Sequence, residues 1–102
     1  MMFRVDQGDT DRAFRLVGEL DLASAEHMLQ RLEPVAGQPG DLDLDAAELT
    51  FIDSTGLHGL VTLTRKLGSH GRLIIHNAHP FVRKVVAIAG LDQQQVFILT
   101  ED

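Results

Sequence analysis

Apolar and polar residues alternate in the first part of the chain with the period of β-strands. The alternation runs over Phe3 to Val5 and again over Ala13 to Val17, on either side of a Gly8-Asp9 turn. Successive side chains of a strand point to opposite faces, so a period of two predicts two neighbouring strands. A third alternating segment, Asp41 to Ala46, predicts a short strand with three carboxylates pointing towards water.

Two longer segments repeat their apolar residues at the spacing of a helix. The first follows Asp21, which is placed to cap it, and Pro34 is expected to end it because proline disfavours helix at the residue before it. The second follows Asp53 and is expected to end at Gly68 or Gly71. Their predicted apolar faces consist of Leu22, Ala25, Leu29, Leu32 and Val35 in the first helix and Leu57, Leu60, Val61, Thr64 and Leu67 in the second.

The last third of the chain contains two predicted strands with a helix between them. The strands are Leu73 to His76 and Val96 to Leu99. Pro80 suits the first turn of the helix, and Gly90 stops it because glycine accepts a left-handed backbone. The predicted apolar face of this helix consists of Phe81, Val82, Val85, Val86 and Ala89.

The predicted order of elements is β-β-α-β-α-β-α-β. Strands separated by helices imply right-handed crossovers, so we expect an α/β fold with a mixed, mostly parallel five-stranded sheet, about three helices and one antiparallel edge near the N-terminus. The 102 residues show no linker or repeat, and residues 1–102 are expected to form a single domain. Functional sites of such sheets lie where strands lead into helices, as at Leu49 to Leu57.

Composition excludes several classes of function. The formal net charge is −6 and the nine Lys and Arg are scattered, which disfavours nucleic acid as a partner. No stretch approaches the ~20 apolar residues of a membrane span, and the N-terminus lacks a basic, apolar leader, so no direct membrane insertion and a cytoplasmic location are expected. The absence of cysteine excludes disulfides, thiolate nucleophiles and cysteine metal sites.

The segment Phe51 to Leu57 places Ser54 at the start of a predicted helix. Backbone N–H groups there lack partners and the helix dipole is positive, so the site can hold a phosphate with little strain. A phosphate would add about −1.5 to −2 charges beside Asp53, which can disrupt the binding of a partner. The alternative is that Asp53, Ser54 and Thr55 only cap the helix, and spacing alone favours this alternative.

Other chemistry is disfavoured by the residues around these positions. A catalytic serine in a G-x-S-x-G turn needs glycine where this chain has Ile52, so we assign no catalytic residue and expect no enzyme activity. His76 and His79 are near in sequence but lack a third ligand. The three aspartates of the predicted strand are expected to be solvated, so no metal and no cofactor are assigned.

Three segments resemble the STAS domain, which bacterial anti-sigma factor antagonists and sulfate transporters share. They are Val17 to Asp21 with Ala25-Glu26, then Phe51 to Leu57, and Pro80 to Leu91, within a resemblance from Ala13 to Leu99. It implies an antagonist that binds an anti-sigma factor with serine kinase activity and so frees a sigma factor. Phosphorylation of Ser54 would break that complex and a phosphatase would restore it, a partner switching mechanism in transcription regulation and stress response.

The resemblance also implies a partner surface and a monomer when free. The residues carried over to that surface are Asp21, Asp53, Ser54, Thr55, Gly56, Leu57 and His58. His58 stands where the family usually has a small residue. Many family members continue into a further C-terminal helix, which is not expected here because the sequence given ends at Asp102.

A second function agrees with the same resemblance. The protein would then be a non-switching STAS adaptor subunit that docks on the ATPase of a membrane transport complex. Such an adaptor has no need of a phosphorylatable hydroxyl, so Ser54→Ala distinguishes it from the switch.

Overall fold

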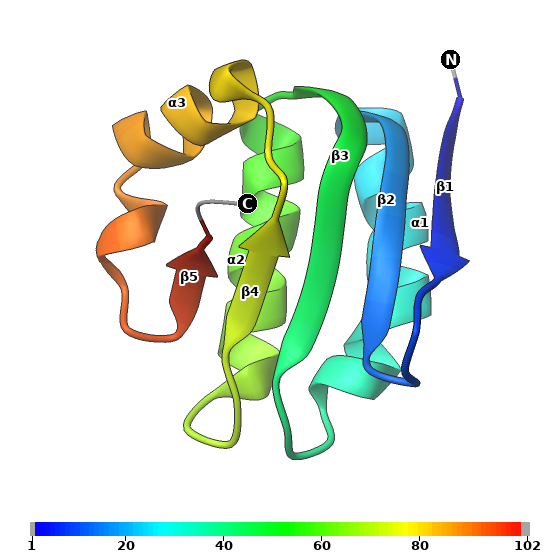
Figure 1. Cartoon of the computed structure of the whole chain (residues 1–102), viewed down its shortest axis with the longest axis vertical. Coiled ribbons are helices and arrows are strands. Elements are labelled where there is room, and N and C mark those ends of the chain that lie inside the picture. The colour runs from blue at the N-terminus through cyan, green and yellow to red at the C-terminus, as the bar shows by residue number, and fades with distance from the viewer. Residues whose placement is uncertain (1, 101–102) are drawn as a thin grey trace.

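Strands and helices of the computed structural model, which describes residues 2–100, follow the order that the sequence predicts (Figure 1). The strands are β1 (Phe3–Gln7), β2 (Ala13–Leu20), β3 (Leu42–Ile52), β4 (Leu73–His76) and β5 (Phe97–Leu99). The helices are α1 (Leu22–Ala36), α2 (Ser54–Leu67) and α3 (Pro80–Ile88), and a 3-10 turn, η1 (Leu91–Gln93), leads into β5. The predicted α/β class is therefore confirmed.

The five strands lie in the sheet in the order in which they occur in the chain. β1 pairs antiparallel with β2, whereas β2, β3, β4 and β5 are mutually parallel. This confirms the mixed sheet with one antiparallel edge. Because the parallel strands run in one direction, β2 and β3 end at the same edge of the sheet, at the top of Figure 1, where α1 and α2 begin.

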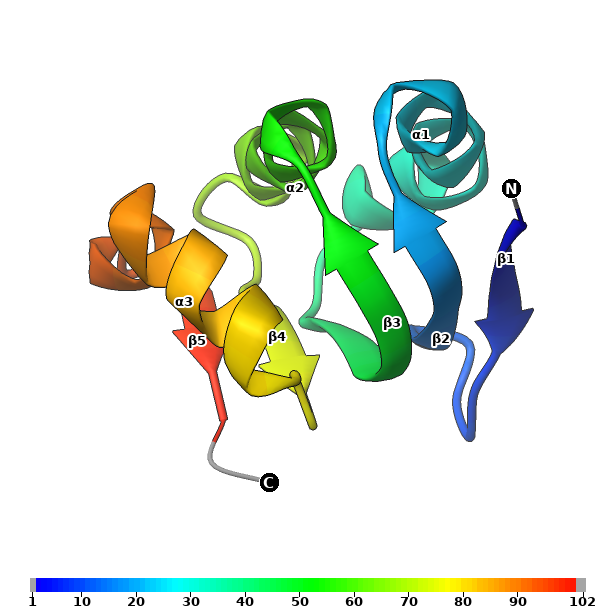
Figure 2. The same ribbon diagram turned by 90° about the horizontal axis from the view of Figure 1, so that it is seen from above.

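Helices α1 and α2 lie side by side on one face of the sheet (Figure 2), and the core fills the space between. Period-two alternation turns Leu16 of β2 and Leu44 of β3 towards Met28 of α1 and Leu63 of α2, and all four side chains are at most 1% exposed. Helix α3 lies near the upper edge, beyond the end of β4. No helix within residues 2–100 combines the length and apolar character needed to cross a membrane.

The opposite face of the sheet carries charged and polar side chains that are bonded across strands. The Asp43 carboxylate lies 2.8 Å from Nε2 of His76, and Nη2 of Arg72 lies 3.1 Å from Oδ2 of Asp41. Asp45 accepts a hydrogen bond from Asn77 at 3.3 Å. The three aspartates thus lie on the expected, solvent-facing side of the sheet. The sequence pattern did not indicate their partners, which come from residues about thirty positions later.

Asp41 gives this face a pH dependence. The hydrogen bonds donated by the Arg72 side chain and backbone N–H hold the pKa of Asp41 below its ordinary value. Because the pKa is lower in the folded than in the unfolded protein, the interaction stabilises the folded state at pH values above the ordinary pKa of about 3.9. This stabilisation is lost as the pH falls through the folded-state pKa. Asp41→Asn should therefore cost less than about 1 kcal/mol near pH 7, since the pair is exposed. The thermal unfolding midpoints of the wild type and Asp41→Asn should converge in acid. A difference between the midpoints that stays the same in acid would contradict the role of the Asp41 carboxylate.

Three expectations about the elements were wrong for reasons of tertiary contact. Pro34 lies inside α1, which continues to Ala36 because Ala36 is 1% exposed in the core and Arg12 donates to the carbonyl of Val35. Leu22 is 75% exposed, since the buried face of α1 consists of Ser24, Ala25, Met28, Leu32 and Ala36. β3 is not short: it runs for 11 residues because its pairing with β2 continues to Ile52.

Candidate functional site

The ends of β2 and β3 bring the two predicted parts of the partner surface together. The backbone N–H of Asp53 donates to the carbonyl of Leu20 at 3.2 Å. Gly56, in the first turn of α2, packs so closely on β2 that a Cβ atom there would lie 2.4 Å from the Leu20 oxygen. Asp21 and Asp53, 32 residues apart in sequence, therefore belong to neighbouring turns at one edge of the sheet.

Asp53 fixes the start of α2. Its extended backbone, with φ −113° and ψ −173°, places the carboxylate so that Oδ1 accepts the N–H of Gly56 at 2.9 Å. The carbonyl of Asp53 accepts the N–H of Leu57 at 2.9 Å. The capping interpretation is therefore confirmed for Asp53, while Ser54 and Thr55 are already helical residues.

Ser54 is the first residue of α2, and its side chain is exposed. Its hydroxyl makes no hydrogen bond to any residue in the described part of the chain. The carboxylate of Asp53 satisfies the N–H of Gly56, which leaves the N–H groups of Ser54 and Thr55 at the positive end of the helix dipole. The geometry thus offers an accessible hydroxyl beside backbone donors suited to an anion.

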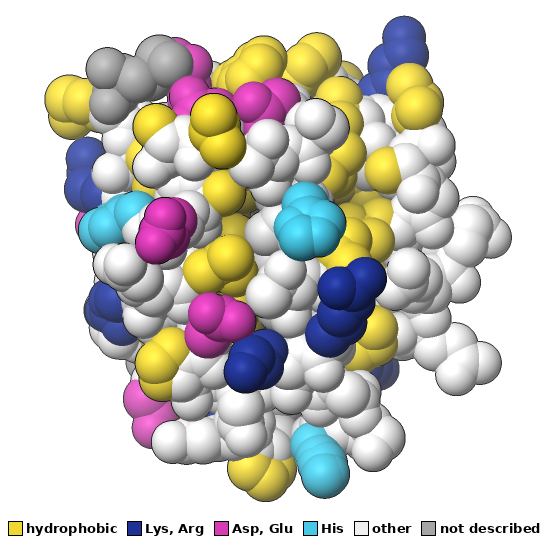
Figure 3. Space-filling model, turned by 180° about the vertical axis from the view of Figure 1, so that it is seen from behind, with side chains coloured by type: hydrophobic (Ala, Val, Ile, Leu, Met, Phe, Trp, Pro, Cys, Tyr) yellow, Lys and Arg dark blue, Asp and Glu magenta, His cyan; other side chains and the backbone are white. Residues whose placement is uncertain are grey.

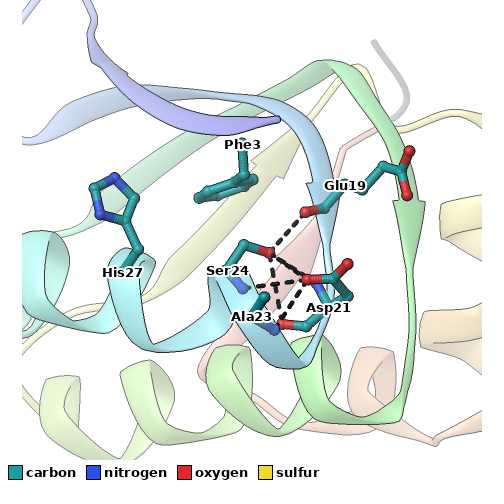
Figure 4. Close-up of a pocket in the computed structure, with 6 residues that line it drawn as sticks. All are labelled: Phe3, Glu19, Asp21, Ala23, Ser24 and His27. Atoms are coloured by element: carbon teal, nitrogen blue, oxygen red, sulfur yellow. Dashed lines mark hydrogen bonds between the residues drawn. The ribbon is translucent and has the colours of Figure 1, made fainter. Parts of the chain in front are cut away.

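Asp21 caps α1 through a reciprocal pair of hydrogen bonds with Ser24 (Figure 4). Oδ1 of Asp21 accepts the N–H of Ser24 at 3.2 Å, and the Ser24 hydroxyl accepts the N–H of Asp21 at 2.9 Å. That hydroxyl also donates to the carbonyl of Glu19 at 2.7 Å. A glutamate or glutamine at the Ser24 position would have signalled this capping box, but serine gives a weaker signal, and sequence reasoning missed its role.

A depression of about 170 Å³ lies beside this cap. Phe3 and His27 form one side of it, with their rings edge to face and their centroids 6.2 Å apart. Figure 4 shows the carboxylate of Glu19 pointing away from both rings. The depression therefore presents aromatic edges and the Asp21 cap, and sequence reasoning had not placed Phe3 or His27 near the site because their contact joins β1 to α1.

Large apolar side chains are exposed close to these two turns. Leu22 follows Asp21, and Phe51 precedes the α2 cap and is 38% exposed. The Phe51 ring stacks on that of Phe81 in α3, with centroids 6.0 Å apart, and Phe81 is 49% exposed rather than in the core as predicted. Figure 3 shows hydrophobic and acidic side chains together along the upper edge of the molecule. Exposed aromatic and aliphatic side chains in one region are typical of protein contacts.

The remaining predicted partner residues differ in exposure. His58 is exposed, one helical turn after Ser54, whereas Leu57 is partly buried against the core. Gly56 is buried, so it contributes close packing and no contact surface. Thr55 is partly buried beside Ser54.

The histidines considered as metal ligands have separate partners. His76 contacts Asp43, and Nε2 of His79 lies 2.7 Å from the carbonyl of Ala47, so the two rings do not converge on one point. Within residues 2–100, no three side chains of the usual ligand types lie together as a metal site.

Comparison with known proteins places this geometry in a family. The family model described as "Mlab, STAS domain" matches residues 3–101. The chain is 31% identical over 90 residues to the anti-sigma-B factor antagonist of Bacillus subtilis (strain 168), covering 85% of this chain and 81% of that protein.

Solved structures show the same fold. An anti-sigma factor antagonist from Mycobacterium paratuberculosis matches with a TM-score of 0.76 and 26% identity, over 99% of this chain and 86% of that one. SpoIIAA in its unphosphorylated form matches with a TM-score of 0.71 and 22% identity, over 99% and 89%. The phosphorylated form of Bacillus SpoIIAA matches with a TM-score of 0.69 and 24% identity, over 99% of this chain and 93% of that one. Since the family model spans nearly the whole chain, this protein belongs to the STAS domain family.

Proposed function

We propose that this protein is an anti-sigma factor antagonist whose binding is switched off by phosphorylation of Ser54. The unphosphorylated protein binds an anti-sigma factor with serine kinase activity and thereby releases a sigma factor; a phosphatase acting on phosphorylated Ser54 restores binding. The observation that carries this proposal is the exposed hydroxyl of Ser54 at the first position of α2, which forms no hydrogen bond within residues 2–100. The relatives that share the fold support it, because they are regulatory proteins of this class.

The surface around Ser54 explains how a phosphate can act without changing the fold. Leu22 and Phe51 supply exposed apolar area for a partner, and Asp21 and Asp53 are committed to helix caps. Phosphate oxygens can meet the N–H groups at the start of α2, so the modification introduces little strain. The unphosphorylated and the phosphorylated SpoIIAA both share the fold of this chain, which supports a switch that keeps the fold.

The effect on the partner follows from the added charge. A phosphate brings about −1.5 to −2 charges to a contact that must lose water on binding. Where the partner offers no new cation, desolvation and repulsion weaken the complex by a few kcal/mol, and each 1.4 kcal/mol corresponds to about tenfold in affinity. On this account the protein acts by binding alone and performs no chemistry of its own.

Capture of partners from the native cell lysate tests the switch. Ser54→Ala should retain a kinase-like anti-sigma factor, and Ser54→Asp should weaken its capture by about tenfold or more, a lower limit because aspartate carries less charge than phosphate. Ser69→Asp, at an exposed serine beyond the other end of α2, is the matched control and should bind like the wild type. Incubation with ATP and the captured kinase should modify the wild type and spare Ser54→Ala.

The opposite result supports the adaptor function. If wild type, Ser54→Ala and Ser54→Asp all retain the same transporter ATPase to the same extent, the proposed switch is wrong. The protein is then a STAS subunit whose surface at this edge serves constitutive docking.

A further inference from the structure

The outward face of α2 carries one basic side chain within reach of Ser54. The buried residues of this helix are Gly56, Gly59, Leu60, Leu63, Thr64 and Leu67, and Ser54 and His58 are both exposed. Residues four apart on a helix lie on one face, with Cβ atoms about 6 Å apart. Because side chains lean towards the N-terminus of their helix, His58 extends in the direction of Ser54.

The ring of His58 differs in its contacts from the rings of three other histidines. His27 contacts the Phe3 ring, His76 contacts Asp43, and His79 contacts the carbonyl of Ala47. His58 takes part only through its backbone carbonyl, which accepts from the Thr62 hydroxyl at 3.0 Å. Within the described residues its imidazole therefore has no hydrogen bond or ion pair.

Charged groups around His58 do not compete for it. Helix α2 contains no Asp or Glu; Asp53 before it is bonded to the N–H of Gly56, and Arg65 lies two turns further on. Helix α2 packs on the sheet, where Gly56 meets Leu20 and Ile52, and on α1, where Gly59 meets Ala25 and Met28. The charged side chains Asp43 and His76 of the strands beneath it pair with each other on the opposite face of the sheet. The charged or titratable groups of α1 and its cap are Asp21, Glu26, His27, Arg31 and Glu33, and none forms an ion pair or hydrogen bond with His58.

We propose that His58 is the counter-charge that holds the phosphate of phosphorylated Ser54. This inference rests on the proposed function, and it concerns the modified state of the same site. The protonated imidazole donates an N–H to a phosphate oxygen one turn towards the N-terminus, alongside the backbone N–H groups of Ser54 and Thr55.

The sign of the effect is fixed by electrostatics. A cation beside the phosphate favours its dianion and lowers its second pKa, which is near 6 for a phosphoserine. A His58 cation beside the phosphate would offset part of the phosphate charge. Because the second pKa of a phosphoserine lies near 6, phosphorylation should block the partner more strongly at about pH 8, where the dianion predominates, than at about pH 6.

The test uses protein in which Ser54 is phosphorylated during synthesis by genetic encoding. A ³¹P NMR titration should give a second phosphate pKa about half a pH unit lower in the phosphorylated protein that retains His58 than in the phosphorylated His58→Gln variant. His58→Lys should keep the lowered value because it keeps a cation. His70→Gln, at an exposed histidine beyond the other end of α2, is the matched control and should leave the phosphate pKa unchanged.

Two results would overturn the inference. One is an equal phosphate pKa in His58→Gln and in the protein that retains His58. The phosphate would then be bound by backbone N–H groups alone. The other is an equal change in His70→Gln, which shows a general charge effect. Because the phosphate is installed without a kinase, a failure here leaves the proposed switch standing, and a failure to find a kinase leaves this result unaffected.

Discussion

Gly56→Ala should lower the free energy of unfolding by about 3 kcal/mol, as overpacking of a tight contact does. The added Cβ would lie 2.4 Å from the Leu20 oxygen, 2.9 Å from Leu20 Cγ and 3.0 Å from Ile52 Cγ1. The nearest of these atoms is backbone, so relief requires the first turn of α2 to move away from β2. Urea denaturation followed by circular dichroism measures the loss.

Gly37→Ala is the matched control for this glycine. Gly37 has φ −73°, a backbone that alanine adopts freely, and a Cβ there would meet its nearest atom, the Glu33 oxygen, at 3.5 Å. Its stability should stay within about 1 kcal/mol of the wild type. If Gly56→Ala is as stable as Gly37→Ala, the close packing of α2 on β2 does not hold the site in place.

Arg12→Ala should cost about 3 kcal/mol, because it removes several charge-assisted hydrogen bonds at once. The guanidinium donates to four backbone carbonyls at distances of 2.9 to 3.2 Å, those of Val35, Gln38, Gly40 and Asp41. Val35 lies in the last turn of α1, and Gln38, Gly40 and Asp41 lie between α1 and β3. Arg12 therefore joins the turn between β1 and β2 to the end of α1 and to the loop before β3. The planar guanidinium can donate to several carbonyls at once, whereas the ammonium of lysine cannot reproduce this geometry. Arg12→Lys should therefore recover only part of the stability that Arg12→Ala loses.

Arg4→Ala controls for the loss of a surface arginine. Arg4 pairs with Asp6 at 3.0 Å, and its side chain is 55% exposed, so its removal should cost less than about 1 kcal/mol. Both variants are compared by chemical denaturation at the same pH and salt. Equal costs for Arg4→Ala and Arg12→Ala would mean that the four carbonyl contacts add nothing beyond an ordinary surface charge.

The elements were predictable where they depend on neighbouring residues. Alternation over Ala13 to Val17 and helical spacing after Asp53 report the faces of a strand and of a helix directly. Caps are equally local, and Asp21, Asp53 and Gly90, with φ 76°, act as predicted. The position of Ser54 at a helix start followed from the same local chemistry.

Contacts between distant parts of the chain were not predictable in this way. Pro34 is tolerated because packing and Arg12 hold the last turn of α1, and neither is visible in the local pattern. The stacking of Phe51 on Phe81 places two large rings at the surface, against the simple expectation for apolar residues. The close fit of Gly56 on Leu20 depends on sheet pairing, so the sequence suggested two partner segments without showing that they touch.

The order of the strands bears on how the protein is made. Each strand of the sheet pairs with its predecessor in the chain, so no strand has to be inserted between two that are already paired. During synthesis on the ribosome the sheet can grow one strand at a time from β1, with few long loops to close. By the time α2 has emerged, β2, β3 and both helices that frame Ser54 are available. The region around Ser54 can thus assemble before β4, α3 and β5 have been translated.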